Sequence, residues 1–577
     1  MAEWLGKLFR IQRWIYSYNR NDLKGDILAG ITTGAMLIPQ GMAYAVIAGA
    51  PPIYGLYSGV VPLLIYPLMG TSRHISIGPV ALDMLIVAAA FERIGPLEPL
   101  AFISLAFMVT LFTGLTQVLL GTLRLGFVFK FFSRPVISGF TIAAPIIIIS
   151  SQIGSLTGIE VPNSQYFYSV LYSLGTDITQ LHYVTFATGF CSILFLAVLR
   201  YTKPKLPASV FLVILGIIAS AVFHFESAGI SIVGNIKAGL PNLKAPDISF
   251  AVLRDLLPII LTLALVQFMN VASLGRAFAK RHGYIIDPNH ELIAVGTSNV
   301  AGAFFQSLPV SASFSRSAAS ERAGGKTAFA NVITSLIIII SLLALTPYFY
   351  FLPEAVLSAI IIVSVAGLVD LKEIRYLFKT KRSEGLVAVF TALATLLIGI
   401  QDGILLGVLV SLLVVIFLMS RPNVAELGLK CGTRTFKNKE LDEEAEDLDD
   451  IIILRVDAAF SFINAKYFRD YILEKSEQQN QNIHYVIIDG STINDLDITA
   501  IDALKNVAKT LKEWDISLYI TSLKAPVRKV VARSGLKDYL GEDHFCRSPH
   551  QAVQRVLEKL DKEDGGNRLQ NYLEKAG

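Results

Sequence analysis

Two short apolar stretches begin with polar sequence that contains glycine, proline or serine. The first is introduced by residues 76–79 and runs over 80–91, and the second is introduced by 309–316 and runs over 317–319. A helix needs about 20 apolar residues to cross a bilayer, so segments this short indicate discontinuous helices that begin inside the membrane. The N-terminal end of a helix carries partial positive charge. We therefore expect both starts to point at an anion near the middle of the bilayer.

The composition of the chain places most of it in a membrane. Of the 577 residues, 53% are hydrophobic and only 17% are charged, which excludes an ordinary soluble protein. No Asp, Glu, Lys or Arg lies within 27–72, whereas the chain is dense in charge after 420. We expect three parts: an N-terminal cytoplasmic or interfacial segment at 1–26, a membrane domain at 27–420, and a cytoplasmic linker, soluble domain and tail at 421–577.

Hydropathy predicts fourteen membrane segments. They are 27–49, 51–69, 79–91, 98–121, 127–152, 182–199, 206–224, 253–275, 287–305, 309–320, 327–347, 351–368, 384–400 and 402–419. Lys and Arg gather on every second connection, and an even number of segments puts both termini in the cytoplasm. Seven segments precede the 225–252 loop and seven follow it, so the halves have opposite orientation, as in an inverted repeat. The short helices are then the third element of each half, and their starts should meet at the repeat interface.

Three motifs, at 38–45, 70–79 and 313–317, resemble the sulfate permease (SulP) family. The resemblance covers essentially the whole chain. It implies a polytopic α-helical membrane protein of two intertwined seven-segment inverted repeats, with a core domain that moves against a gate domain, and a homodimer. It implies no enzymatic chemistry. The plain tail, without an added enzyme domain, favours a bacterial inner membrane.

By matching position, the resemblance also implies an anion site built from the first, third and tenth segments. Its residues would be Gln40, Tyr44, Pro79, Val80, Phe314, Ser315 and Arg316. Ser315 and the backbone N–H groups of a helix start can donate to an oxyanion, and Gln40 offers an amide donor. A cation at mid-membrane costs on the order of 2.5–3.5 kcal/mol on insertion scales, so Arg316 needs a wet cavity or a protein partner. Two roles are open for it: supplying positive field at the site, which we favour, or pairing with a carboxylate.

The coupling residues depart from part of that family. Several proton-coupled members carry Glu where Gln40 and Asn270 stand here, and an amide cannot carry a proton. An anion that enters against a negative interior needs about 2.3 kcal/mol per charge per 100 mV, so this departure favours exchange for a counter-anion over proton symport. Asp83, about one helical turn beyond Pro79, is the remaining acid. It could carry a proton or sodium, pair with Arg316, or serve as a structural hydrogen-bond acceptor.

The tail predicts a small α/β domain. We expect strands at 451–456, 484–488 and 517–521 and helices at 465–477, 498–513, 525–534 and 549–560. Residues 486–501 resemble the strand, loop and helix of the STAS domain (sulfate transporter and anti-sigma-factor antagonist), whose loop can bind partners or be phosphorylated. Thr499 is the single hydroxyl at the matching place, and we favour a helix N-cap at Asp497 over its phosphorylation.

Other motifs are discounted. The stretch 323–327 resembles a phosphate-binding loop, but no predicted strand precedes it, and we expect a cytoplasmic turn. The eight His residues form no ligand-like cluster, and Cys191, Cys431 and Cys546 have no metal or disulfide spacing. We expect no metal, cofactor, structural disulfide or nucleic-acid partner.

Together, these patterns and the resemblance favour secondary active transport of a small oxyanion by an elevator-like movement, with sulfate ahead of bicarbonate, chloride or a dicarboxylate. An anion channel and a sensor that reports through the tail are alternatives of other classes. A nucleobase transporter is disfavoured because Arg316 suits an anion better than a neutral base. The expected partners are the anion, a co-transported proton or sodium or a counter-anion, the lipid bilayer and a second copy of the chain.

Overall fold

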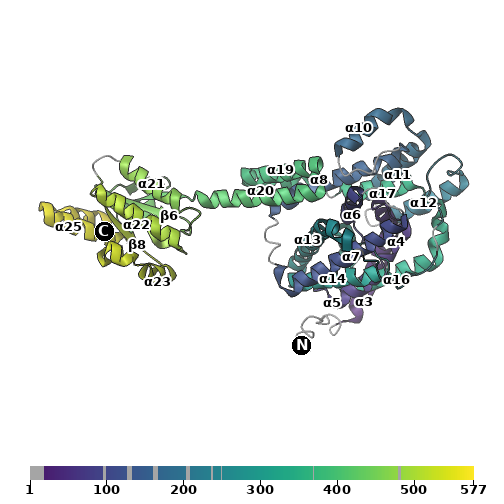
Figure 1. Ribbon diagram of the computed structural model, residues 1–577, viewed down its shortest axis with the longest axis horizontal. Coiled ribbons are helices and arrows are strands. Elements are labelled where there is room, and N and C mark those ends of the chain that lie inside the picture. The colour runs from purple at the N-terminus through teal and green to yellow at the C-terminus, as the bar shows by residue number, and fades with distance from the viewer. Residues whose placement is uncertain are drawn as a thin grey trace. The chain divides into compact units, whose positions relative to one another are not determined.

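The structure is a computed structural model that describes residues 18–94, 99–126, 133–159, 167–202, 208–235, 238–248, 250–367, 369–478 and 483–577. The chain forms two compact units, Met1–Ser411 and Leu412–Gly577. The first consists of helices and one pair of very short strands, and the second contains a mixed sheet (Figure 1). Of the predicted interfacial segment, residues 1–17 lie outside the described part of the chain.

A helix lies at each of the fourteen predicted membrane segments. In chain order, the helices of this part of the chain are α3 (Arg20–Ile47), α4 (Pro52–Tyr57), α5 (Val61–Met69), α6 (Ala81–Ile94), α7 (Pro99–Thr122), α8 (Arg134–Ser151), α9 (Ile153–Thr157), α10 (Phe167–Asp177), α11 (Tyr183–Thr202), α12 (Ala208–Val222), α13 (Phe250–His282), α14 (Pro288–Phe304), α15 (Phe314–Arg322), α16 (Phe329–Ile340), α17 (Glu354–Ala366), α18 (Leu371–Thr380), α19 (Arg382–Ile398) and α20 (Ile400–Ser420). Of these, α4 and α5 share the predicted segment 51–69, and α9, α10 and α18 lie outside the predicted segments. Within the described residues, eight helices are long and apolar enough to cross a membrane. The chain is therefore a polytopic helical membrane protein.

The two predicted half-helices are short, and their starts lie side by side. Helix α6 has 14 residues and α15 has 9. Each follows a two-residue strand, β1 (Ile77–Gly78) or β2 (Ser311–Ala312), and these strands pair antiparallel with Ile77 opposite Ala312. The second helix begins at Phe314, after the strand, so the predicted segment at 309–320 contains the strand as well as the helix. Segments more than two hundred residues apart are joined here, as the repeat predicts.

Two buried asparagines complete the hydrogen bonding of the strand pair. Asn331 of α16 donates to the Ile75 carbonyl oxygen at 2.8 Å and accepts from the Ile77 nitrogen at 3.3 Å. Asn299 of α14 donates to the Val310 carbonyl oxygen at 3.2 Å and accepts from its nitrogen at 2.8 Å. An isolated strand pair leaves backbone groups without partners, which is costly away from water. The two amides supply those partners.

Glycines let the helices around the strands approach closely. A Cβ added to Gly114 of α7 would lie 2.6 Å from the carbonyl oxygen of Gly296 of α14, and one added to Gly296 would lie 2.7 Å from that of Gly114. Small residues at such crossings are the usual means of helix association in a membrane. The α7–α14 pair therefore forms a fixed support for the strand anchor Asn299.

The second unit is a sheet with helices on both faces. Its strands run in the order β4-β3-β6-β7-β8-β9, with β5 also paired to β3. Their bounds are β3 (Val424–Lys430), β4 (Phe436–Asn438), β5 (Ala445–Glu446), β6 (Ile451–Val456), β7 (Tyr485–Asp489), β8 (Ser517–Thr521) and β9 (Phe545–Cys546). Strands β6 to β9 are parallel and β3 is antiparallel to β6. The three predicted strands are thus confirmed as β6, β7 and β8, whereas the other four were not predicted.

Six helices cover the two faces of this sheet. They are α21 (Ala465–Gln478), α22 (Ile498–Glu513), α23 (Ala525–Arg533), α24 (Leu536–Leu540), α25 (Pro549–Asp564) and α26 (Arg568–Ala576). The first four share one core, and α25 and α26 share the other. Helix α22 packs on β8, and Figure 1 shows it over the sheet. The four predicted helices of the tail are confirmed as α21, α22, α23 and α25.

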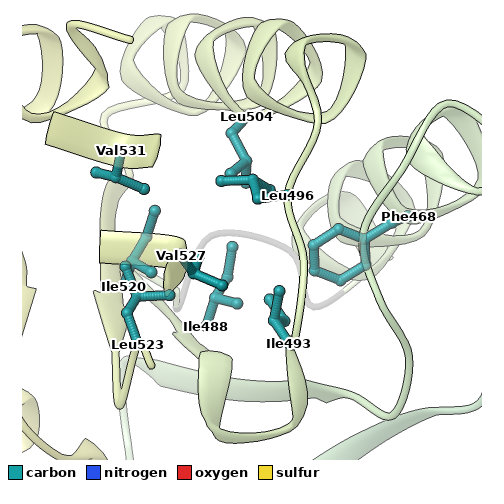
Figure 2. Close-up of a pocket in the computed structure, with 9 residues that line it drawn as sticks. All are labelled: Phe468, Ile488, Ile493, Leu496, Leu504, Ile520, Leu523, Val527 and Val531. Atoms are coloured by element: carbon teal, nitrogen blue, oxygen red, sulfur yellow. The ribbon is translucent and has the colours of Figure 1, made fainter. Parts of the chain in front are cut away.

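A small cavity lies within the first of these cores (Figure 2). It has a volume of about 10 Å³, and all of its lining side chains are apolar: Phe468, Ile488, Ile493, Leu496, Leu504, Ile520, Leu523, Val527 and Val531. A space of this size holds one water molecule at most, and only where polar groups surround it. The cavity is a packing gap and not a ligand site.

Candidate functional site

Arg316 lies in the first turn of α15 and is completely buried. Its Nη1 atom donates to the Pro79 carbonyl oxygen at 3.0 Å and to Gln40 Oε1 at 3.5 Å. Its Nε and Nη2 atoms are buried and have no hydrogen-bond partner among the described residues. A guanidinium normally uses all five of its N–H groups when it leaves water. Two nitrogens of this cation are therefore free to bind an anion.

Arg316, Gln40 and Pro79 are thus joined by hydrogen bonds. Most of the other predicted site residues lie within a few positions of one of these three along the chain. Gln40 and Tyr44 are both buried, one turn apart on α3. Val80, directly before α6, is half-buried. The hydroxyl of Ser315 lies 3.3 Å from that of Ser313, whose oxygen caps α15 by accepting from the Arg316 nitrogen.

Two predicted residues are not drawn into this group. The Phe314 side chain is 57% exposed, so it does not belong to the buried cluster around Arg316. Asn270 is half-buried on α13, and no hydrogen bond among the described residues joins it to Gln40, Pro79 or Arg316.

Asp83 is fully buried one turn into α6. Its Oδ2 atom accepts from Gln267 Nε2 at 3.0 Å, and its Oδ1 atom has no partner among the described residues. It makes no ion pair with Arg316 within the described part of the chain, because the guanidinium bonds to Pro79 and Gln40 instead. The pairing of Asp83 with Arg316, one of the alternatives from the sequence, is therefore not a direct contact in this structure.

Asp83 is the last member of a buried hydrogen-bond network whose other members are side-chain amides. The sequence analysis did not predict this network. Gln267 Oε1 accepts from Gln117 Nε2 at 2.8 Å and from Asn299 Nδ2 at 3.1 Å. Asn299 in turn holds the residue before β2. A lone Gln or Asn within an apolar membrane segment was the available signal, since such residues are costly there unless they are bonded. The network connects the start of α6 to the start of α15 by a second route.

Two buried carboxylates hold the turns that lead into and out of the site. Glu291 of α14 accepts from the Thr71 nitrogen at 2.6 Å and the Ser72 nitrogen at 2.8 Å. Asp26 of α3 accepts from the Lys326 nitrogen at 2.8 Å and the Thr327 nitrogen at 3.0 Å. The amides of the 324–327 turn are thus bound to a carboxylate of the protein, which agrees with the prediction that this stretch is not a phosphate loop.

In the second unit, the helix cap predicted at Asp497 is confirmed. Its side chain accepts from the Ala500 nitrogen at 2.9 Å and from the Phe462 nitrogen at 2.7 Å. Thr499 is exposed on the first turn of α22. Among the described residues, no group of three or more His, Cys, Asp or Glu could hold a metal ion.

Comparison with known proteins decides the family. The profile of the sulfate permease family matches residues 23–391, and that of the STAS domain matches 443–552. The chain belongs to the sulfate permease family. The resemblance found in the sequence is therefore confirmed.

Two relatives match this chain over most of its length and most of theirs. The chain is 34% identical over 595 residues to the chloroplastic sulfate transporter 4.1 of Arabidopsis thaliana, covering 100% of this chain and 86% of that protein. It is 33% identical over 537 residues to a probable sulfate transporter of Mycobacterium tuberculosis, covering 93% and 96%. These relatives are named as transporters and not as enzymes.

The fold of this chain is also that of solved anion transporters. The murine Solute Carrier 26 family member A9 anion transporter, in its inward-facing state, has a TM-score of 0.87 at 25% identity, covering 94% of this chain and 93% of that one. The transmembrane domain of a cyanobacterium bicarbonate transporter, BicA, has a TM-score of 0.58 at 22% identity, covering 68% and 97%. The likeness to BicA concerns the fold alone.

Proposed function

We propose that this chain carries sulfate across the membrane and holds it where α6 and α15 begin. The observation that carries the proposal is the buried Arg316, with Nε and Nη2 unpartnered, at the junction of the two helix starts. Helix starts favour anions through their free N–H groups and their dipoles. Ser315 adds a hydroxyl donor at the same place.

The chemistry of this site suits sulfate. Sulfate has four acceptor oxygens, and a guanidinium fork binds two oxygens of one oxyanion at once. The two relatives described above are named as sulfate transporters. Bicarbonate and dicarboxylates offer similar oxygen pairs and stay as alternatives, while chloride offers no such pair.

We infer an elevator-like movement from the way glycines group the helices. Gly30 packs α3 on α16, as Gly114 packs α7 on α14, and α15 packs on α3. In a second set, Gly139 packs α8 on α19 and Gly216 packs α12 on α17. Gln40, Tyr44 and Arg316 belong to the first set, on α3 and α15, and the 3.5 Å contact of Gln40 Nε2 with Ser364 Oγ of α17 connects the sets. The first set is the proposed moving core and the second the proposed gate.

This movement should change the exposure of Ser364. In a protein whose Cys191 and Cys431 are replaced by Ser, a Ser364→Cys thiol should react with a membrane-impermeant reagent at a rate that depends on the side to which sulfate is added. A rate that is the same with and without sulfate on either side would argue against a moving core.

Whether transport is driven by exchange or by a co-transported cation depends on which side chains can carry a proton. We propose exchange for an internal anion, because Gln40 and Asn270 cannot carry a proton, with a cation carried by Asp83 as the alternative. The experiment is labelled sulfate uptake into proteoliposomes under a proton gradient, a sodium gradient, or internal chloride or bicarbonate. Uptake that needs only an internal anion supports exchange. Uptake driven by a cation gradient and lost in Asp83→Asn, but retained in Asp22→Asn, supports symport.

We infer cytoplasmic termini from the alternating Lys and Arg pattern, and a homodimer from the family resemblance. The bacterial inner membrane stays a prediction, since one relative is mycobacterial and another is named as chloroplastic.

A further inference from the structure

Helix α18 is a short amphipathic helix between two membrane segments. The candidate span Glu354–Thr380 contains both α17 and α18, but all of the Lys and Arg residues of this range lie on α18. The next helix, α19, packs along the candidate span α8. Asp370 caps it by accepting from the nitrogens of Lys372 and Glu373 at 3.0 and 3.2 Å. Leu377 is buried, and Phe378 packs against Gly385 of α19. This packing fixes which face of α18 is turned outward.

The outward face is basic. Five cationic side chains in twelve residues are exposed: Lys372, Arg375, Lys379, Lys381 and Arg382. None of the five forms an ion pair in the part of the chain that the structure describes, and the acid on this helix, Glu373, is occupied by Arg134 of α8, at 2.6 and 3.1 Å. The cluster therefore carries positive charge that no carboxylate on α18 neutralises.

Apolar side chains lie beside these cations. Leu371 is 68% exposed and Tyr376 is 52% exposed, and the guanidinium of Arg134 lies 5.2 Å from the centre of the Tyr376 ring. A helix that exposes both Lys or Arg and large apolar groups suits the boundary of a bilayer, where apolar groups enter the acyl region and cations meet headgroups. Its place between membrane helices puts α18 at that boundary.

We propose that α18 and the residues directly after it bind the headgroups of anionic phospholipids in the leaflet where the helix lies. Each Lys or Arg near an anionic surface contributes to such binding, and the contribution is screened by salt. Lipid binding at α18 would also hold α8, because the bidentate bond of Arg134 to Glu373 joins α18 to the first residue of α8. This inference does not depend on which anion is transported.

Hydrogen exchange of residues 371–382 tests the inference in the full chain. The protein is placed in nanodiscs of phosphatidylcholine alone or with phosphatidylglycerol. Exchange should be slower with phosphatidylglycerol, and high salt should remove the difference without any mutation. Soluble glycerophosphate added to phosphatidylcholine discs should have no effect. Equal exchange in both lipids, or protection by glycerophosphate, would overturn the proposal.

A matched pair of variants extends this test. Lys372→Gln/Arg375→Gln/Lys379→Gln should weaken phosphatidylglycerol binding about a hundredfold. The control, Arg528→Gln/Lys529→Gln/Arg533→Gln, removes three exposed cations from α23 of the STAS domain and should bind as wild type does. Phosphatidylglycerol protection that is equal in the two variants would also overturn the proposal.

Discussion

Arg316 Nη1 donates to the carbonyl oxygen of Pro79 at 3.0 Å, so the first turn of α15 is bonded to the residue that leads into α6. The pairing of Ile77 with Ala312 makes the same junction through the backbone. Because both a side chain and a strand pair hold the two helix starts together, an anion bound there as proposed would meet donors from both halves of the membrane domain at once.

Gly78→Ala should damage this junction. Gly78 has a φ of +147°, and a Cβ at this position would lie 3.0 Å from Arg316 Nη2. A non-glycine residue in such a conformation costs on the order of 1–3 kcal/mol. We expect a lower thermal unfolding temperature in detergent and reduced sulfate uptake. Gly175→Ala in α10 is the control, since nothing lies within 4 Å of its added Cβ, and a variant of Gly78 as stable as this control would contradict the prediction.

Gln267→Leu should destabilise the protein through Asp83. The substitution removes the bond to Asp83 Oδ2 and leaves that carboxylate without a described partner. A buried polar group that loses its partner costs about 1–3 kcal/mol, and more when it is charged. The double variant Asp83→Leu/Gln267→Leu should recover part of the loss, which a double-mutant cycle of unfolding temperatures measures. Strictly additive effects would show that the two side chains do not interact.

Asp26→Ala should lower the stability of the protein more than Asp22→Ala does, although both acids lie on α3 and contact the same turn. Asp26 is buried and accepts from two backbone nitrogens, which is worth on the order of 3 kcal/mol. Asp22 pairs at 3.2 Å with Lys326, whose side chain is 57% exposed, and such surface pairs are worth about 0–1 kcal/mol. Unfolding temperatures and hydrogen exchange of 324–328 compare them, and equal losses would refute the assignment of Asp26 as the anchor of the turn.

Acid should loosen the C-terminal helix α26. The Nδ1 atom of His550 is bonded to the Tyr572 hydroxyl, and burial, with a smaller contribution from Arg434, lowers the pKa of this imidazole. The folded state therefore favours neutral His550. Its contribution to stability is complete above the unfolded pKa of about 6.5 and is lost as the pH falls towards the folded value.

Hydrogen exchange of 568–577, corrected for intrinsic rates, measures this effect. Exchange should accelerate below pH 6.5 in the wild type and depend less on pH in His550→Gln. The same acceleration in both proteins would assign the effect to another group.

The sequence predicted the parts of the fold that leave a pattern along the chain. Apolar runs located the fourteen segments at which helices lie, and the polar starts at 76–79 and 309–316 located the short helices α6 and α15. Strands of two residues, such as β1, have no periodicity to detect. Gln40, Pro79 and Arg316 came together as expected, because helix starts and the family motifs mark them. Phe314 did not, because the exposure of a side chain depends on packing from other elements.

The amide network was not predicted for a related reason. Gln117, Gln267 and Asn299 are each one polar residue in an apolar segment, and nothing along the chain says which of them meet. Their partners are set by helix packing, including the Gly114 and Gly296 contact that brings α7 against α14.

Equilibrium binding of labelled sulfate to the purified protein tests the central claim most directly. Arg316→Gln removes the cation at the two helix starts, and Arg322→Gln removes an exposed cation from the end of the same helix. A charge-assisted pair contributes about 1.5–3 kcal/mol, so we predict that sulfate affinity falls roughly ten- to hundredfold in Arg316→Gln and is unchanged in Arg322→Gln. Wild-type affinity in a folded Arg316→Gln protein would show that sulfate is held elsewhere.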